Sequence, residues 1–202
     1  MSLLPALSPW QQRAYAHAAA AIDAGHFGHA TLITGPALIG KRLVAEHLAR
    51  RVLCQSRGVD GEACGACKGC SLFASRAQYD PLETRPDGSP SHPWGHSAHP
   101  DLLMVGYEVN TKTGKPRGEL VIEQIRTLSE KLTLTAQRDG AQVAIVDPAD
   151  AINWNAFNAL LKTLEEPPAH VKFIFATTEA HKVLPTIISR CQRFDLRRIP
   201  SA

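Results

Sequence analysis

The chain has 202 residues, of which 44% are hydrophobic and 20% are charged, which is the balance of an ordinary globular protein. Its net charge of +3 comes without a long Lys/Arg run, so composition permits nucleic-acid contact without arguing for it. No apolar stretch approaches the roughly 18 residues of a membrane span, and no secretory signal pattern is present. We therefore expect a cytoplasmic protein, in which clustered cysteines are more often metal ligands than disulfides.

The hydrophobic pattern predicts helices alternating with strands. A Ser-Pro start and an Ala-rich run ending at Gly25 indicate a first helix of about 14 residues. Further strands are expected at 30–34, 101–107, 142–147, 171–178 and 192–196, and helices at 40–54, 120–134, 151–166 and, as a short element, 184–191. Residues 78–100, rich in Pro, Gly, Ser and His, are interpreted as a loop insertion without regular structure. Because the strands are nearly continuous apolar runs, we predict an α/β fold with a parallel sheet covered by helices on both faces.

Residues 35–42, GPALIGKR, match the phosphate-loop pattern G-x-x-x-x-G-K and lack its final Ser or Thr. Gly35 and Gly40 allow backbone N–H groups to turn toward phosphate oxygens, and Lys41 can reach the terminal phosphates. Arg42 stands where a hydroxyl normally holds Mg²⁺, and a guanidinium has no lone pair for a cation. We interpret the segment as a loop of nucleotide-binding ancestry, with present ATP binding left open and a plain glycine-rich turn as the alternative.

A second catalytic position is also altered, at the end of the strand expected over 142–147. Asp147 is placed to orient Mg²⁺, but the next residue is Pro148, where an active ATPase of this kind carries a glutamate that polarises water. Asp150 lies three residues further on and reaches the site only if the turn folds back. The alternative role for both aspartates is turn and helix-cap chemistry. The changes at Arg42 and Pro148 together argue against ATP hydrolysis.

Four cysteines, Cys54, Cys64, Cys67 and Cys70, fall within a span of 17 residues. Their C-x2-C steps allow the sulfurs to reach one tetrahedral Zn²⁺, and four thiolates leave no open position on the ion. We therefore predict a structural zinc knuckle at 54–70. Free thiols and disulfides are the alternatives.

A rival set of ligands is formed by His92, His96 and His99, which lie within the 78–100 insertion. We expect this stretch to be flexible, and the three histidines do not lie on a predicted helix. The four cysteines are therefore the preferred zinc ligands. Cys191 lies in a different context from the other cysteines.

The run 155–194, which contains ALLKTLEEPP and TIISRCQRF, resembles the clamp-loader branch of the AAA+ proteins. With the cysteine knuckle, the chain is similar to bacterial clamp-loader subunits from Trp10 to Phe194. The two altered ATPase positions favour the delta-prime branch of that family over the gamma/tau motor branch. The stretch 78–97 is longer than the usual link in the family.

The resemblance implies a five-subunit spiral in which ATP lies between neighbouring subunits. A subunit of the delta-prime branch does not hydrolyse ATP, and lends an arginine to the ATP of a motor subunit. That arginine matches Arg190, flanked by Ser189 and Cys191. Its implied partners are gamma/tau and delta-type subunits, with DNA and a sliding clamp contacted through the assembly. The alternative is that Arg190 caps a helix or pairs with an acid such as Asp195.

The resemblance also places a sensor-1-like position at Thr178, with Thr177 as the neighbouring choice. Glu165 and Glu166 are interpreted as solvated charges at a helix end. Members of the family carry a helical lid and a collar after this core. Residues 1–202 are therefore expected to be the AAA+ core alone, a fragment that is monomeric by itself.

Two rival functions remain open at this point. An active gamma/tau-type ATPase would require Arg42 and Pro148 to be tolerated at catalytic positions. A zinc-bearing nucleic-acid binding module is permitted by the knuckle and the basic charge, but the basic residues show no interleaved aromatics.

Overall fold

The computed structural model describes residues 4–77, 83–110, 112–138 and 140–197. Its main sheet has five strands in the order β4-β5-β6-β1-β7, and every neighbouring pair is parallel. The strands are β1 (Ala30–Thr34), β4 (Leu102–Val105), β5 (Gln142–Val146), β6 (Val171–Thr177) and β7 (Gln192–Asp195). All residues of β1 and β5 are buried, which explains their continuous apolar sequences. The predicted parallel sheet is confirmed.

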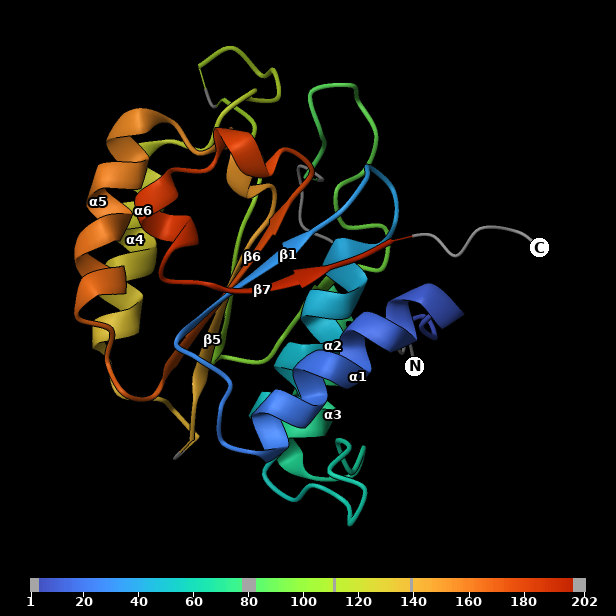
Figure 1. Ribbon diagram of the computed structural model, residues 1–202. Coiled ribbons are helices and arrows are strands. Elements are labelled where there is room, and N and C mark those ends of the chain that lie inside the picture. The colour runs from blue at the N-terminus through green and yellow to red at the C-terminus, as the bar shows by residue number, and fades with distance from the viewer. Residues whose placement is uncertain (1–3, 78–82, 111, 139, 198–202) are drawn as a thin grey trace.

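Helices cover both faces of the sheet (Figure 1). One face carries α1 (Pro9–Asp23), α2 (Lys41–Leu53) and α3 (Lys68–Ala74), and the other carries α4 (Ile122–Thr133), α5 (Trp154–Glu165) and α6 (Pro185–Ile188). Each layer of helices buries its own hydrophobic cluster against the strands. The described part of the chain contains no helix with both the length and the apolar character needed to cross a membrane.

The ends of the helices follow local sequence signals. In α1, Pro9 takes the first helical position, and the backbone N–H of Ser8 donates to Gln11 Oε1 at 2.7 Å. The helix predicted to begin at 151 begins three residues later, and residues Ala149–Ala151 form a separate 3₁₀ turn, η1. Helix α5 then begins after Asn153, whose side chain accepts from the backbone N–H of Ala156 at 3.0 Å.

The described part of the 78–100 insertion, 83–100, is largely loop and contains one short strand that was not expected. Its strand β3 (His96–Ser97) pairs antiparallel with β2 (Arg76–Ala77), and Thr84 forms a bridge with Pro90. Two of its histidines, His92 and His99, are buried. Residues 78–82 lie outside the described part. Buried imidazoles and backbone pairing keep this segment folded against the domain.

Candidate functional site

Three of the predicted functional segments meet at one edge of the main sheet. In the parallel register, Thr34 at the end of β1 lies beside Thr177 at the end of β6, and Val146 of β5 lies beside Phe175. The loop 35–40, Asp147 and Thr178 therefore all leave the sheet at the carboxyl ends of its strands. This is the edge at which open α/β sheets bind ligands.

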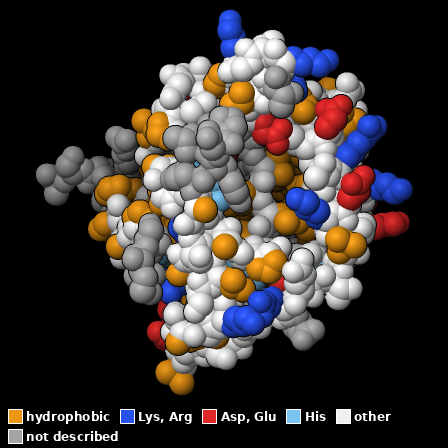
Figure 2. Space-filling model, turned by 180° about the vertical axis from the view of Figure 1, so that it is seen from behind, with side chains coloured by type: hydrophobic (Ala, Val, Ile, Leu, Met, Phe, Trp, Pro, Cys, Tyr) orange, Lys and Arg blue, Asp and Glu red, His pale blue; other side chains and the backbone are white. Residues whose placement is uncertain are grey.

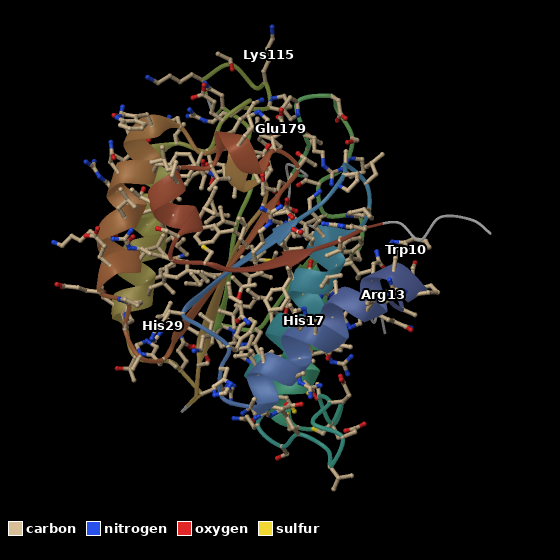
Figure 3. The ribbon with its side chains drawn as sticks, in the orientation of Figure 1. Trp10, Arg13, His17, His29, Lys115 and Glu179 are labelled. Atoms are coloured by element: carbon tan, nitrogen blue, oxygen red, sulfur yellow. The ribbon has the colours of Figure 1, made fainter. Side chains whose placement is uncertain are left out.

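The loop has the backbone shape that its glycines were expected to allow. Gly40 has a φ of +90°, and a Cβ added there would lie 1.9 Å from Gln11 Nε2. That amide donates to the carbonyl oxygen of Ile39 at 2.9 Å, and Trp10 Nε1 approaches the same oxygen at 3.4 Å. Gly35 has a φ of +153° and also lacks room for a side chain. Helix α1, which carries Trp10 (Figure 3), therefore fixes the loop from the side.

Lys41, the first residue of α2, lies against its own loop. Its Nζ donates to the carbonyl oxygens of Gly35 at 3.0 Å and Pro36 at 2.8 Å. Burial lowers the pKa of Lys41, while the negative charges of Asp147 and Asp150 raise it. The ammonium group is therefore bonded to the backbone of the loop itself.

Arg42 lies between two carboxylates. Its Nη1 is 3.6 Å from Asp147 Oδ2, its Nε is 3.7 Å from Glu46 Oε1, and the residue is only 5% exposed. Burial raises the pKa of Asp147, and the charges of Arg42 and Lys41 lower it. The guanidinium group thus faces the carboxylate that was expected to orient Mg²⁺. Glu46 was missed from the sequence because its position on α2 looks like an ordinary charged helix position.

Asp150 does fold back, but it contacts β6 and the residue after it. Its Oδ1 accepts from the Thr177 hydroxyl and, at 3.0 Å, from the backbone N–H of Thr178. Thr177 is buried, whereas Thr178 is exposed. These bonds match the turn and cap chemistry that was the alternative role for Asp150.

Arg190 lies just after α6 and is exposed. Its Nη1 donates to the carbonyl oxygen of Thr186 at 2.8 Å, and its Nη2 is 3.0 Å from Glu165 Oε1. The suggested partner Asp195 instead pairs with Arg193 at 2.7 Å. Glu165 is exposed, as expected of a solvated charge, and also pairs with Arg190. The two contacts of Arg190 match its alternative role, a helix cap and a pair with an acid, with Glu165 in place of Asp195.

The residues that flank Arg190 have different surroundings. Ser189 is exposed, and its hydroxyl donates to the carbonyl oxygen of Thr186 at 3.1 Å. Cys191 is half-buried against the core beneath α4 to α6, and burial raises the pKa of its thiol to about 12. Cys191 is therefore a packing residue, separate from the other four cysteines.

The four predicted zinc ligands lie together between α2 and α3. The Sγ of Cys54 is 3.6 Å from that of Cys64 and 3.9 Å from that of Cys67, and all four sulfurs lie within 4.8 Å of one another. Sulfurs bonded to one tetrahedral Zn²⁺ at about 2.3 Å are separated by about 3.8 Å. The backbone N–H of Cys70 donates to Cys67 Sγ at 3.4 Å, as expected in a knuckle. The cluster fits a metal ion.

An ion-pair network holds this knuckle to α1 and α2. Arg51 of α2, which is 2% exposed, pairs with Asp23 at 2.5 Å and with Glu62. The Tyr15 hydroxyl also donates to Glu62, at 2.6 Å. Sequence reasoning missed these contacts, since they join residues from α1, α2 and the knuckle loop.

A second group of possible metal ligands contains two of the histidines from the rival set. Glu83, His92 and His96 place their ligand atoms within 4.8 Å of one another. Burial and the nearby Arg42 charge lower the pKa of His92. His99 is not part of this group, because its Nδ1 accepts from the backbone N–H of Asp101 at 3.1 Å.

Comparison with known proteins agrees with this arrangement. The family described as "DNA polymerase III, delta subunit" matches residues 10–200. The delta' subunit of DNA polymerase III from Pseudomonas aeruginosa is 37% identical over 183 residues, covering 91% of this chain and 46% of that protein. The delta' subunit from Haemophilus influenzae is 31% identical, covering 96% and 50%. The tau subunit from Bacillus subtilis is 35% identical, covering 87% and 26%.

A solved structure shares the fold. It is a DNA polymerase III gamma subunit-related protein from Thermotoga maritima, with a TM-score of 0.54 at 22% identity, covering 86% of this chain and 42% of that one. This chain spans about half the length of the delta' relatives named above. The parallel sheet, the glycine-rich loop before α2 and the match over residues 10–200 agree, and the chain belongs to the delta/delta' family of clamp-loader subunits of DNA polymerase III.

Proposed function

We propose that this chain is a non-hydrolysing subunit of the DNA polymerase III clamp loader, which supplies Arg190 to the ATP of a neighbouring motor subunit. The delta' and tau relatives support a place in that complex. Gamma/tau and delta-type subunits are its proposed partners. DNA and the sliding clamp are contacted through the assembled complex during replication, in the cytoplasm.

The contact between Arg42 and Asp147 carries the non-hydrolysing part of the proposal. Mg²⁺ binds oxygen ligands at about 2.0–2.1 Å in octahedral geometry, and a guanidinium supplies neither an oxygen nor a lone pair. With the Arg42 Nη1 only 3.6 Å from Asp147 Oδ2, a fixed positive charge already satisfies the carboxylate. Pro148 cannot activate water. Both features favour a loop that keeps its phosphate-binding shape without catalysing hydrolysis.

The surroundings of Arg190 support a role at another subunit's nucleotide. The guanidinium is exposed, and its two contacts, the Thr186 carbonyl and the Glu165 carboxylate, are made by separate nitrogens. This arrangement holds the planar group at the surface with donors left for phosphoryl oxygens. An arginine presented in this way can stabilise the charge that develops during phosphoryl transfer.

For the four cysteines we propose a structural Zn²⁺. Four thiolates complete a tetrahedron, so the ion would hold residues 54–70 together without binding substrate. Purified protein should contain this zinc, and Cys67→Ser should remove it. Cys191→Ser, which changes a cysteine outside the knuckle, should leave the zinc in place. Folded protein that holds no metal at the knuckle when purified without a chelator, and binds none there when zinc is added, would contradict the proposal.

The test of the main proposal is ATP turnover in a loader reconstituted with motor subunits. The other motor subunits carry a loop-lysine substitution, so only the site beside this chain turns over. Arg190→Ala should reduce that turnover by about 10³-fold, which is the lower range for an arginine finger. The matched control is Arg193→Ala, which removes another exposed arginine of the same segment.

Two results would contradict the proposal. The first is an unchanged rate with Arg190→Ala in an assembled loader. The second is ATP turnover by this chain alone that disappears with Lys41→Ala, since it would show an active site within the chain.

A further inference from the structure

We infer that Glu83, His92 and His96 form a second metal site, which binds a divalent transition-metal ion of the Zn²⁺ class. All three residues come from the segment between β2 and β4, and their side chains are 14%, 1% and 12% exposed. Two imidazoles and one carboxylate are a donor set that suits zinc and its first-row neighbours.

The distances within the group fit a bound ion. Glu83 Oε2 is 3.3 Å from His92 Nε2 and 3.2 Å from His96 Nε2. Nitrogen and oxygen ligands about 2.0–2.1 Å from a tetrahedral Zn²⁺ lie about 3.3 Å apart. Charge-assisted hydrogen bonds are shorter, at about 2.7–2.9 Å. The spacing is therefore closer to the edges of a coordination tetrahedron than to a pair of ionic hydrogen bonds.

A second layer of polar contacts supports the group. Glu46 of α2 is fully buried, and its Oε1 lies 4.0 Å from His92 Nδ1. The carboxylate is held by Arg76 at 2.7 Å and by Trp94 Nε1 at 2.9 Å. Histidines that bind metals commonly have a carboxylate behind the second ring nitrogen. Glu46 lies on that side of the His92 ring, at 4.0 Å from Nδ1, which is longer than a hydrogen bond.

Charges of both signs surround the group. Of the three arginines that act on His92, Arg42 pairs with Asp147 at 3.6 Å and Arg76 pairs with Glu46 at 2.7 Å, whereas Arg85 bonds to Ser89 and to the Pro90 carbonyl. Glu83 contributes a further carboxylate within the group itself. A divalent ion would therefore bind beside three arginines, with these carboxylates offsetting the positive charge.

The surrounding space also suits a bound ion. A Cβ at position 106 would lie 2.1 Å from Glu83 Oε1, so Gly106 provides the space that this carboxylate occupies. A cavity of about 740 Å³ between β4 and α4 is lined by Glu83 and His96 among others. The face shown in Figure 2 carries hydrophobic side chains around its hollowed centre. Because three protein ligands leave a zinc position open, the cavity would supply an entry path and a place for a small ligand.

The second site would stabilise a different segment from the cysteine knuckle. Its ion would hold residues 83–97 against α2, close to the part of that helix that carries Arg42. Metal binding at this site depends neither on ATP hydrolysis by a neighbouring subunit nor on Arg190. The second metal site and the proposed clamp-loader function can therefore be tested separately.

The experiment is a metal titration. Metal-free chain, prepared with a chelator and checked for folding by circular dichroism, is titrated with Zn²⁺ and then with Co²⁺. We expect two equivalents of either metal to bind. The cobalt spectrum should contain one component with a thiolate-to-metal charge-transfer band, from the knuckle, and one without it. The double variant His92→Gln/His96→Gln should lose only the component without that band, and bind one equivalent.

Matched variants make the result decisive. His26→Gln, which changes an exposed histidine outside the group, should still bind two equivalents. Cys64→Ser/Cys67→Ser should keep only the component without the charge-transfer band, and Glu83→Gln should weaken that component. A wild-type chain that binds a single equivalent, with a purely thiolate spectrum, would overturn the proposal without reference to any variant.

Discussion

Arg42 and Arg190 are the same residue type in opposite settings. Arg42 is buried between Asp147 and Glu46, at distances of 3.6 and 3.7 Å. Arg190 lies at the surface, and its ion pair with Glu165 joins side chains that are 37% and 54% exposed. Removing a buried charge that faces carboxylates leaves those carboxylates without a partner, which destabilises the fold. An exposed, oriented charge remains available to a partner.

The largest difference expected between substitutions of Arg42 and Arg190 is in folding stability. Arg42→Ala leaves Asp147 without its cation in a buried environment, so we expect a loss of about 3 kcal/mol in the free energy of unfolding. Arg190→Ala removes a solvent-screened pair and should lose no more than about 1 kcal/mol. Urea denaturation measures both. Arg42→Lys, which keeps the charge, should retain more stability than Arg42→Ala. Equal losses at Arg42 and Arg190 would show that burial does not separate the two arginines.

A second effect is expected in the magnesium dependence of nucleotide binding. In the wild-type chain, ATP titrations with Mg²⁺ and with a chelator should give the same dissociation constant or the same lack of binding. Arg42→Thr restores a hydroxyl beside Asp147, so Mg²⁺ should tighten ATP binding about tenfold, or about 1.4 kcal/mol. Lys41→Ala serves as the control that removes the phosphate contact. Wild-type binding that requires Mg²⁺ would show that Arg42 does not exclude the ion.

The smallest effect concerns the orientation of Arg190. Glu165→Gln removes the charge that holds one side of the guanidinium, so turnover in the reconstituted loader should fall about threefold, the scale of an exposed ion pair. Glu166→Gln changes the neighbouring exposed glutamate, for which no contact with Arg190 is found among the described residues, and should leave the rate unchanged. If the two variants behave alike, Glu165 does not position the arginine.

Much of the fold could be predicted from the sequence, because the signals are local. The apolar run 30–34 is β1, and the loop before Lys41 has the strand before it and the helix after it that the motif requires. The C-x2-C steps also placed four sulfurs together, since a few residues of turn suffice to bring them into contact. The start of the helix expected over 151–166 was placed too early, because the apolar pattern does not reveal that Asn153 is its N-cap.

The sequence offered His92 and His96 as possible metal ligands, but Glu83 as their neighbour could not be predicted from spacing. Glu83 and His92 are nine positions apart in a segment rich in Pro and Gly, and no helical or strand period relates them. The buried carboxylate Glu46, which lies behind His92, comes from α2. Only the packing of the segment 83–97 on α2 brings Glu46 close to His92 and Glu83.

The sequence by itself determined the chemistry available at two positions: Arg42 has no lone pair for a cation, and Pro148 has no group that activates water. These are properties of the residues, and they hold in any fold. The tertiary structure determined which of these side chains are buried, which are exposed and which groups they contact. It buried Arg42 against Asp147, exposed Arg190 beside Glu165, and folded His92 over α2. Such contacts join residues far apart in the chain, so they depend on the packing of whole elements rather than on local pattern.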